Sequence, residues 1–204
     1  MTIHLDQITK QYSKQTVINK FSYQFQSGES YAIYGHNGSG KSTLIQLLAG
    51  SISPNKGKIT YLLKGKNIPV EELYQYISLA APYMDLIEDM SMKEIIAFHF
   101  SFKKSLVKNP FEIMHQLLNY DASKLIKHYS SGMKQRLKLL LAMLTDSNIL
   151  FLDEPTANFD NEGIEWYRGL IKTYQADRTL IIASAQGHDH DFCTHKISIA
   201  ETSI

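Results

Sequence analysis

Hydrophobic and polar residues alternate along the first part of the chain. The apolar positions there are Ile3, Leu5, Ile8, Phe21, Tyr23 and Phe25. A period of two residues is typical of short strands that bury one face. The pattern therefore predicts half-buried antiparallel strands near the N-terminus, with a turn at Ser27 and Gly28.

Uninterrupted apolar runs occur later, at 31–34, 149–152 and 180–183. Strands that are buried on both faces show such runs. Apolar residues at helical spacing lie between them, at Leu44, Leu47, Leu48, Leu137, Leu140, Leu141 and Leu144. The second group predicts a helix that follows Gly132. Because strands and helices alternate, we expect an α/β protein with a parallel sheet covered by helices.

The middle of the chain has a different pattern. Segments 71–76, 92–102 and 111–119 have helical spacing, and the prolines Pro69, Pro82 and Pro110 separate them. We interpret residues of about 85–128 as a helical subdomain inserted into a single domain that covers 1–204.

Charge and cysteine content narrow the classes of partner. The 21 basic and 20 acidic residues give a net charge of +1, so bulk charge does not suggest nucleic acid as a partner. The single cysteine, Cys193, excludes an intramolecular disulfide and is expected to be a small buried hydrophobe in a reducing cytosol. No apolar stretch reaches the roughly 18–20 residues that cross a bilayer. If the protein works at a membrane, we expect another chain to supply the span.

A glycine-rich loop follows the first apolar run. It consists of Gly35, His36, Asn37, Gly38, Ser39, Gly40, Lys41, Ser42 and Thr43, and it matches G-x-x-x-x-G-K-[ST]. Glycines let successive backbone N–H groups point at phosphate oxygens, and the following helix adds its positive dipole end. Lys41 is suited to supply a positive charge to the β- and γ-phosphates, and Ser42 to supply a hydroxyl to Mg²⁺. Because the loop lies between a buried strand and an amphipathic helix, we expect a site for MgATP rather than a chance turn.

Two carboxylates end the apolar run 149–152. Asp153 and Glu154 would lie at the carboxyl edge of a strand, where open α/β sheets bind ligands. Asp153 is suited to hold Mg²⁺, directly or through water, and Glu154 to polarise the water that attacks the γ-phosphate.

A third element opens the leucine-striped helix. Ser130, Ser131 and Gly132 supply hydroxyls and free N–H groups that suit an anion. Taken alone, the same residues are those of an ordinary helix N-cap.

In this order, the three elements resemble the ATP-binding cassette (ABC) ATPases over nearly the whole chain. The glycine-rich loop is similar to the family's Walker A motif, and Asp153-Glu154 to the end of Walker B. Ser130, Ser131 and Gly132 resemble the signature motif, usually LSGGQ, although Tyr129, Ser131 and Met133 replace its Leu, first Gly and Gln. Asp160 falls in a segment similar to the D-loop. Tyr12 lies where the family places an aromatic that stacks on adenine, although it could also pack on the core as a strand-end residue.

The resemblance implies a fold and a mechanism. The fold is a P-loop NTPase core with an N-terminal antiparallel β subdomain and an inserted helical subdomain. Two cassettes, identical or different, form a head-to-tail dimer with two nucleotides between them. Ser130 and Gly132 of one copy then contact the γ-phosphate held by the other, and closure drives a coupled partner.

Two residues expected from the resemblance are missing. Pro82 lies where the family usually has a glutamine that touches Mg²⁺, and Ala185 lies in place of the switch histidine. Gln186 is a candidate sensor of the γ-phosphate. His188 and His190 are expected to be solvated loop residues, because their use at the γ-phosphate would need an unusual loop.

These departures favour slow hydrolysis rather than an inactive protein, because Lys41, Ser42, Asp153 and Glu154 all remain. We therefore expect the ATPase subunit of a membrane transporter whose permease is a separate chain, of the export type suggested by the signature variant. Such a subunit would be cytoplasmic and peripheral on the inner face of the cell membrane. The aromatic residues of the insertion, Tyr83, Phe98, Phe100 and Phe102, would either dock the permease or form the insertion's core.

Two alternatives remain open. The first is a soluble cassette protein that acts on ribosomes or DNA. The feature that supports it is a basic cluster of Lys124, Lys127, Lys134, Arg136 and Lys138. A solvated helix face explains that cluster more simply, so nucleic acid is not expected as a partner. The second is a nucleotide-gated clamp that binds ATP and hydrolyses it very slowly.

Overall fold

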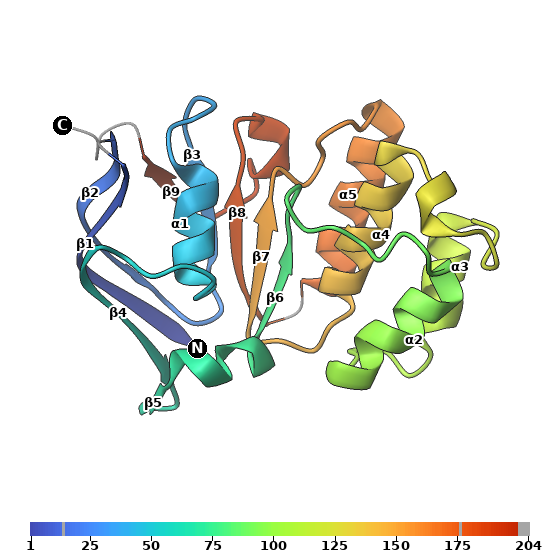
Figure 1. Ribbon diagram of the computed structural model, residues 1–204, viewed down its shortest axis with the longest axis horizontal. Helices are drawn as coiled ribbons and strands as arrows, with labels where there is room; N and C mark the ends of the chain where they lie inside the picture. Colours follow the sequence, from blue (N-terminus) through green and yellow to red (C-terminus); the bar gives the residue numbers. More distant parts are fainter. Residues whose placement is uncertain (14, 176, 200–204) are drawn as a thin grey trace.

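An antiparallel sheet forms one side of the molecule in the computed structural model, which describes residues 1–13, 15–175 and 177–199 (Figure 1). Its strands are β1 (Thr2–Tyr12), β2 (Gln15–Phe25), β4 (Lys56–Leu63) and β5 (Lys66–Ile68), in the order β2-β1-β4-β5. The predicted N-terminal strands are therefore confirmed. The sequence pattern did not reveal β4 and β5, because Tyr61 is the one fully buried side chain of β4.

A parallel sheet forms the centre of the molecule. Its strands are β3 (Ser30–Tyr34), β6 (Ile77–Ala80), β7 (Ile149–Asp153), β8 (Thr179–Ala183) and β9 (His195–Ser198), in the order β6-β7-β8-β3-β9. The apolar runs of β3, β7 and β8 serve two cores. Ile149 and Phe151 pack with the antiparallel sheet, whereas Leu150 and Leu152 pack with the helices on the other face. Burial on both faces explains the absence of alternation.

Helices separate the two sheets and cover the far face of the parallel one. They are α1 (Lys41–Leu48), α2 (Met92–Phe102), α3 (Pro110–Leu118), α4 (Ser131–Met143) and α5 (Asn161–Tyr174). Helix α1 lies between the sheets, and α4 and α5 lie on the opposite side of β7 and β8 (Figure 1). The predicted α/β fold is confirmed. None of the helices in the described ranges has the length and apolarity that a membrane span requires.

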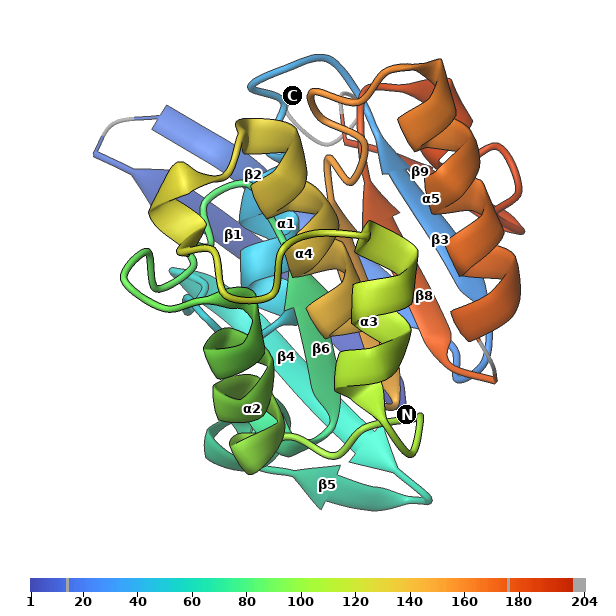
Figure 2. The same cartoon turned by 90° about the vertical axis from the view of Figure 1, so that its right-hand side faces the viewer.

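The predicted insertion contains α2, α3 and the short 3₁₀-helix η2 (Ile126–His128), which lie beside α4 (Figure 2). Ser91 caps α2 through a capping box with Glu94, with Ser91 Oγ accepting from the Glu94 N–H at 3.3 Å. Buried Met92, Ile95 and Ile96 join the core around α4. The division of the chain at about 85–128 stays a prediction.

Two predicted helices differ from the structure. The segment 71–76 forms the 3₁₀-helix η1 (Val70–Gln75), which buries only Leu73 and so lacks an apolar stripe to dock a longer helix. Helix α4 begins at Ser131, one residue before Gly132, because the hydroxyl of Ser130 accepts from the Met133 N–H and caps it. A third 3₁₀-helix, η3 (Gly187–Asp189), follows β8.

Candidate functional site

The glycine-rich loop connects β3 to α1 in a conformation that needs glycine. Gly40 is the N-cap of α1, with φ of 102°, and a Cβ atom there would lie 2.7 Å from Val17 Cγ1. Because Gly40 has no side chain to cap the helix, the first N–H groups of α1 remain open to an anion. The predicted phosphate cradle therefore has the backbone that its function requires.

Lys41 folds back over this loop. Its ammonium donates to the carbonyl oxygens of Gly35, at 3.1 Å, and His36, at 3.2 Å, and lies 3.4 Å from Glu154 Oε1. The side chain is 5% exposed, so these contacts compensate a largely buried charge. A phosphate group entering the loop would meet this cation beside the N-terminus of α1.

A cavity of about 720 Å³ lies over the loop. Its lining residues are Tyr12, Gln15, Val17, Asn37, Gly38, Gly40, Lys41, Ser42, Thr43, Pro82, Glu154, Ala157, Ala185 and Gln186. The size is within the range of small-ligand sites. The fold thus brings together Tyr12, most of the loop, Glu154 and Gln186 from distant parts of the sequence. Of the other loop residues, Gly35 and His36 bind Lys41 through their carbonyls, and Ser39 is buried beneath the loop.

Asp153 ends β7 beneath this cavity and is fully buried. Among the described residues, neither of its carboxylate oxygens has a hydrogen-bond partner of normal geometry. Burial raises the pKa of Asp153 to about 6, and the nearby Ser42 hydroxyl opposes that rise. A buried carboxylate without a partner, beside a hydroxyl, is a set of oxygen donors that fits Mg²⁺.

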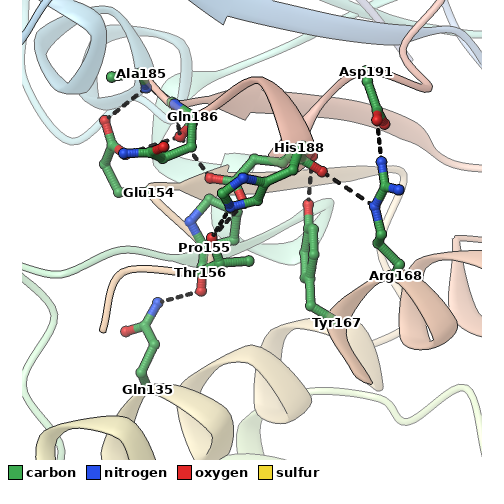
Figure 3. A network of polar contacts seen from close by, with 12 residues as sticks. Gln135, Glu154, Pro155, Thr156, Tyr167, Arg168, Ala185, Gln186, His188 and Asp191 are labelled. Atoms are coloured by element: carbon green, nitrogen blue, oxygen red, sulfur yellow. Dashed lines mark hydrogen bonds and ion pairs between the residues drawn. The ribbon is translucent and has the colours of Figure 1, made fainter. Parts of the chain in front are cut away.

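Glu154 has an unusual backbone, with φ of 44° directly after the strand. Left-handed backbone is costly for residues with a Cβ, so it persists only where the surrounding structure holds it. The side chain is held at both oxygens. Oε1 accepts from the N–H of Ala185 at 3.2 Å (Figure 3). Oε2 accepts from the hydroxyl of Ser184 at 2.9 Å. The acid is therefore fixed at the cavity wall beside Lys41.

The residues that depart from the family pattern occupy different places. Pro82 and Ala185 line the cavity, where neither offers a side-chain polar group, and Gln186 lines it next to Ala185. His188 is not among the lining residues and instead contacts the Thr156 hydroxyl at 3.0 Å. The expectation for His190 is wrong, because it is 6% exposed rather than solvated. The loop after β8 folds back on the core at η3, which buries His190.

The signature and D-loop residues meet on a different face. A hollow of about 290 Å³ is lined by Tyr120, Ser130, Gly132, Met133, Arg136, Asn158, Phe159 and Asp160. Ser130 and Ser131 lie at the N-terminus of α4, where Ser131 is exposed. Asp160 caps α5 by accepting from the Gly163 N–H at 2.8 Å and lies 3.8 Å from Arg136. This hollow shares no lining residue with the cavity over the glycine-rich loop.

Sequence reasoning missed the buried residues behind Glu154. Ser184, Asp189 and Thr156 form a hydrogen-bonded cluster, with Ser184 Oγ 2.5 Å from Asp189 Oδ2 and Thr156 Oγ1 2.6 Å from Asp189 Oδ1. The available signal was the position of Ser184, the first residue after the apolar run of β8. Asp189 carries no such signal, because only the folding of η3 brings it inward.

Known proteins resemble this chain along most of its length. The ABC transporter family model matches residues 18–157. The chain is 33% identical over 192 residues to an uncharacterized ABC transporter ATP-binding protein, YybJ, of Bacillus subtilis, covering 89% of this chain and 84% of that protein. It is 31% identical to the bacitracin transport ATP-binding protein BcrA of Bacillus licheniformis, covering 86% of this chain but 58% of BcrA.

A solved structure shares the fold. It is the ATP-binding cassette MJ0796 as a dimer in a post-hydrolysis state with ADP and phosphate, with a TM-score of 0.82, 18% identity, and coverage of 96% of this chain and 93% of that one. The fold, the glycine-rich loop between β3 and α1, and the matched family model all indicate the same family. The chain belongs to the ABC transporter family as an ATP-binding subunit, and it is an ATPase of the ATP-binding cassette type.

Proposed function

We propose that this chain hydrolyses MgATP as a head-to-tail dimer and thereby drives a separate membrane permease of the export type. The observation that carries the proposal is the separation of the two surfaces described above. Lys41 and Glu154 line the nucleotide cavity, whereas Ser130 and Gly132 line a hollow that shares no residue with it. A second copy is needed to bring the signature residues onto the nucleotide.

The residues of the cavity have separate roles in this proposal. The loop N–H groups and Lys41 bind the phosphates, and the ring of Tyr12, which is 47% exposed at the cavity wall, stacks on adenine. Ser42 and Asp153 hold Mg²⁺, which would neutralise charge developing on the phosphate oxygens. Glu154 accepts a hydrogen bond from the attacking water and orients it toward the γ-phosphate.

The second copy completes the site from its own helix termini. Its Ser130, Ser131 and Gly132 present hydroxyls and free N–H groups to the γ-phosphate. Asp160 lies beside them in the same hollow, so the D-loop reaches the interface as well. The dimer of the cassette MJ0796 supports this assembly in outline. The partner in this dimer is either an identical chain or a different cassette.

A groove beside the helical segment supports docking of the permease. It has a volume of about 400 Å³, and its lining includes Met84, Ile87, Phe98 and Phe102. Phe98 is 44% exposed and Phe102 is 72% exposed. Exposed aromatic side chains around a groove are common at protein interfaces. Tyr83 is exposed nearby, whereas Phe100 packs against the core of the helices. The protein would then be peripheral on the cytoplasmic face of the membrane.

The basic cluster gives little support to a function on ribosomes or DNA. Lys127 pairs with Asp89 at 3.0 Å, Lys134 with Glu88 at 2.5 Å, and Arg136 with Asp160 at 3.8 Å. Lys138 donates to the Ala81 carbonyl at 3.2 Å. These four cations of the cluster have partners inside the chain, which fits the simpler explanation of a solvated helix face.

Steady-state phosphate release tests the proposal. We expect the unmutated protein to hydrolyse ATP slowly, because Pro82 and Ala185 offer no polar side-chain group at the cavity wall. Glu154→Gln should release phosphate at the background rate and trap an ATP-bound dimer. Equal background rates for both proteins would contradict the ATPase role of Glu154. Dimers of the unmutated protein that retain intact ATP would instead favour the clamp.

A further inference from the structure

The hydroxyl of Ser184 is shared among three neighbours. It lies 2.9 Å from Glu154 Oε2 and 2.5 Å from Asp189 Oδ2, and it accepts from the Gln186 N–H at 3.0 Å. Ser184 and Asp189 are both 0% exposed. The catalytic candidate Glu154 is therefore linked to a second, fully buried carboxyl group, that of Asp189, through one hydroxyl.

A count of protons and lone pairs restricts how this cluster can be bonded. A serine hydroxyl has one proton and two acceptor sites, and the Gln186 N–H uses one of these sites. If Asp189 were ionised, it and Glu154 would compete for the single proton, and whenever that proton pointed to Glu154 an oxygen of the fully buried Asp189 would face a lone pair. That arrangement is costly where water cannot intervene.

A neutral Asp189 satisfies every group in the cluster. Its O–H donates to the remaining acceptor site of Ser184, and the Ser184 proton then points to Glu154. The other oxygen of Asp189 accepts from Thr156 Oγ1 at 2.6 Å, and Thr156 in turn lies 3.0 Å from His188 Nε2, which can donate to it. The Tyr167 hydroxyl donates to the Asp189 backbone carbonyl at 2.9 Å and fixes the turn.

The electrostatic surroundings agree with this assignment. Burial raises the pKa of Asp189, and the charge of Glu154 raises it further, whereas Ser184, Thr156 and His188 oppose the rise. Lys41 lies on the far side of Glu154, 3.4 Å from its other carboxylate oxygen, so this cation pairs with Glu154 and not with Asp189. The two acids are thus placed in unlike environments.

We propose that Asp189, as a neutral carboxylic acid, is a positioning residue that turns the Ser184 hydroxyl toward Glu154 and so fixes the aim of the Glu154 carboxylate. The proposal rests on the proposed catalytic role of Glu154. The left-handed backbone of Glu154, with φ of 44°, agrees with this support, because such backbone persists only where neighbouring structure holds it.

Three variants test the proposal through kcat and KM for ATP. Ser184→Ala and Asp189→Ala should each lower kcat about tenfold with KM unchanged, because each removes a hydrogen bond that orients a charged group. Asp189→Asn should recover most of the kcat lost in Asp189→Ala, since its amide donates to Ser184 and accepts from Thr156 as the neutral acid does. The matched control is Ser147→Ala. Its hydroxyl is also buried and bonded, to Ser78 at 2.8 Å, but it precedes β7 at the opposite edge of the sheet, so kcat should not change.

A spectroscopic measurement does not depend on activity or on the alanine variant folding. Infrared difference spectra of protein with ¹³C-labelled aspartate should show a protonated carboxyl band at neutral to mildly alkaline pH that is absent in Asp189→Asn. Absence of that band in the unmutated protein would overturn the neutral state of Asp189.

The kinetic outcomes separate the two levels of the proposal. If the unmutated protein and Glu154→Gln hydrolyse ATP equally, the catalytic role of Glu154 fails and the positioning role fails with it. If Glu154→Gln is slow but Ser184→Ala and Asp189→Ala keep normal kcat, only the positioning role of Asp189 is overturned. An Asp189→Asn variant as slow as Asp189→Ala would also overturn it.

Discussion

The ammonium of Lys41 lies 3.4 Å from the carboxylate of Glu154, so the cation that is proposed to bind phosphate is paired with the proposed catalytic acid before nucleotide enters. The same ammonium donates to the carbonyl oxygens of Gly35 and His36. Binding of a triphosphate must therefore replace these contacts, while the charge on Glu154 repels the incoming anion.

This competition predicts the effect of Glu154→Gln on affinity. The variant should bind a non-hydrolysable ATP analogue about fivefold more tightly, because an ion pair that is partly exposed contributes roughly 1 kcal/mol. Isothermal titration of the monomeric protein measures the effect. Glu162→Gln, which changes an exposed acid in the first turn of α5, is the control. Lys41→Ala should lose most of the binding, and unchanged affinity in Glu154→Gln would show that the pair does not compete.

The raised pKa of Asp153 predicts how the stability of the nucleotide-free protein depends on pH. Because burial raises its pKa to about 6, the folded state retains a proton that the unfolded chain releases near pH 4. The contribution of Asp153 to the free energy of unfolding is therefore greatest below about pH 4. It falls by on the order of 3 kcal/mol as the pH rises to 6.

Urea denaturation across this pH range measures the prediction. Asp153→Asn should be more stable than the unmutated protein above pH 6 and should lack this part of the pH dependence. Asp6→Asn, an exposed aspartate of β1, is the control and should leave the profile unchanged. The Asp153→Asn variant should also weaken the Mg²⁺ dependence of nucleotide binding if Asp153 holds the ion. If Asp153→Asn had the same pH dependence of stability as the unmutated protein, Asp153 would not be the cause of that dependence.

The head-to-tail dimer predicts complementation between two inactive variants. Lys41→Ala disables the cavity of its own chain, and Ser130→Arg should block the signature hollow that serves the other chain. Either variant alone should be inactive, whereas a mixture forms heterodimers with one intact composite site and should regain up to about half the activity per heterodimer. Mixing two preparations of Lys41→Ala is the control. No gain in phosphate release on mixing the unlike variants would argue against sites shared between chains.

The apolar groove predicts a defect in membrane association that leaves the cavity intact. Phe98→Asp combined with Phe102→Asp should reduce copurification with the membrane fraction severalfold, since charge is unfavourable in an apolar contact. Nucleotide binding in solution should not change. Phe192→Asp is the matched control, because Phe192 is exposed but lies outside the groove. Equal copurification of the double variant and the control would exclude the groove as the docking surface.

Two glycines of the loop should respond differently to alanine. Gly38 has φ of 82° but open space where the methyl group of an alanine would lie, so Gly38→Ala should cost roughly 1–2 kcal/mol of stability from backbone strain alone. Gly40→Ala adds a contact of 2.7 Å with Val17 Cγ1 and should be more damaging to both stability and ATP binding. Because truncating Val17 removes that contact, Gly40→Ala should be partly rescued in a Val17→Ala background. Thermal unfolding of these variants and of the unmutated protein measures the predicted order of stability.

Local sequence patterns were enough to predict the main elements and a phosphate site. Apolar runs and helical stripes are local patterns, and the strands β3, β7 and β8 and the helices α1, α2 and α4 follow from them. The phosphate-binding loop is local too, because its glycines, lysine and serine act within one turn of chain. Strand β4 was missed because a strand that buries one side chain fully leaves a weak pattern.

Which distant residues meet depends on contacts that form only in the folded molecule. The parallel register that pairs Asp153 with Ala183 places Glu154 beside Ser184 and Ala185, and no local pattern encodes that pairing. The folding of η3 onto the core buried Asp189 and His190, although His190 was expected to be a solvated loop residue. Burial of polar groups depends on contacts between segments far apart in sequence. The support behind Glu154 could therefore be found only in the folded molecule.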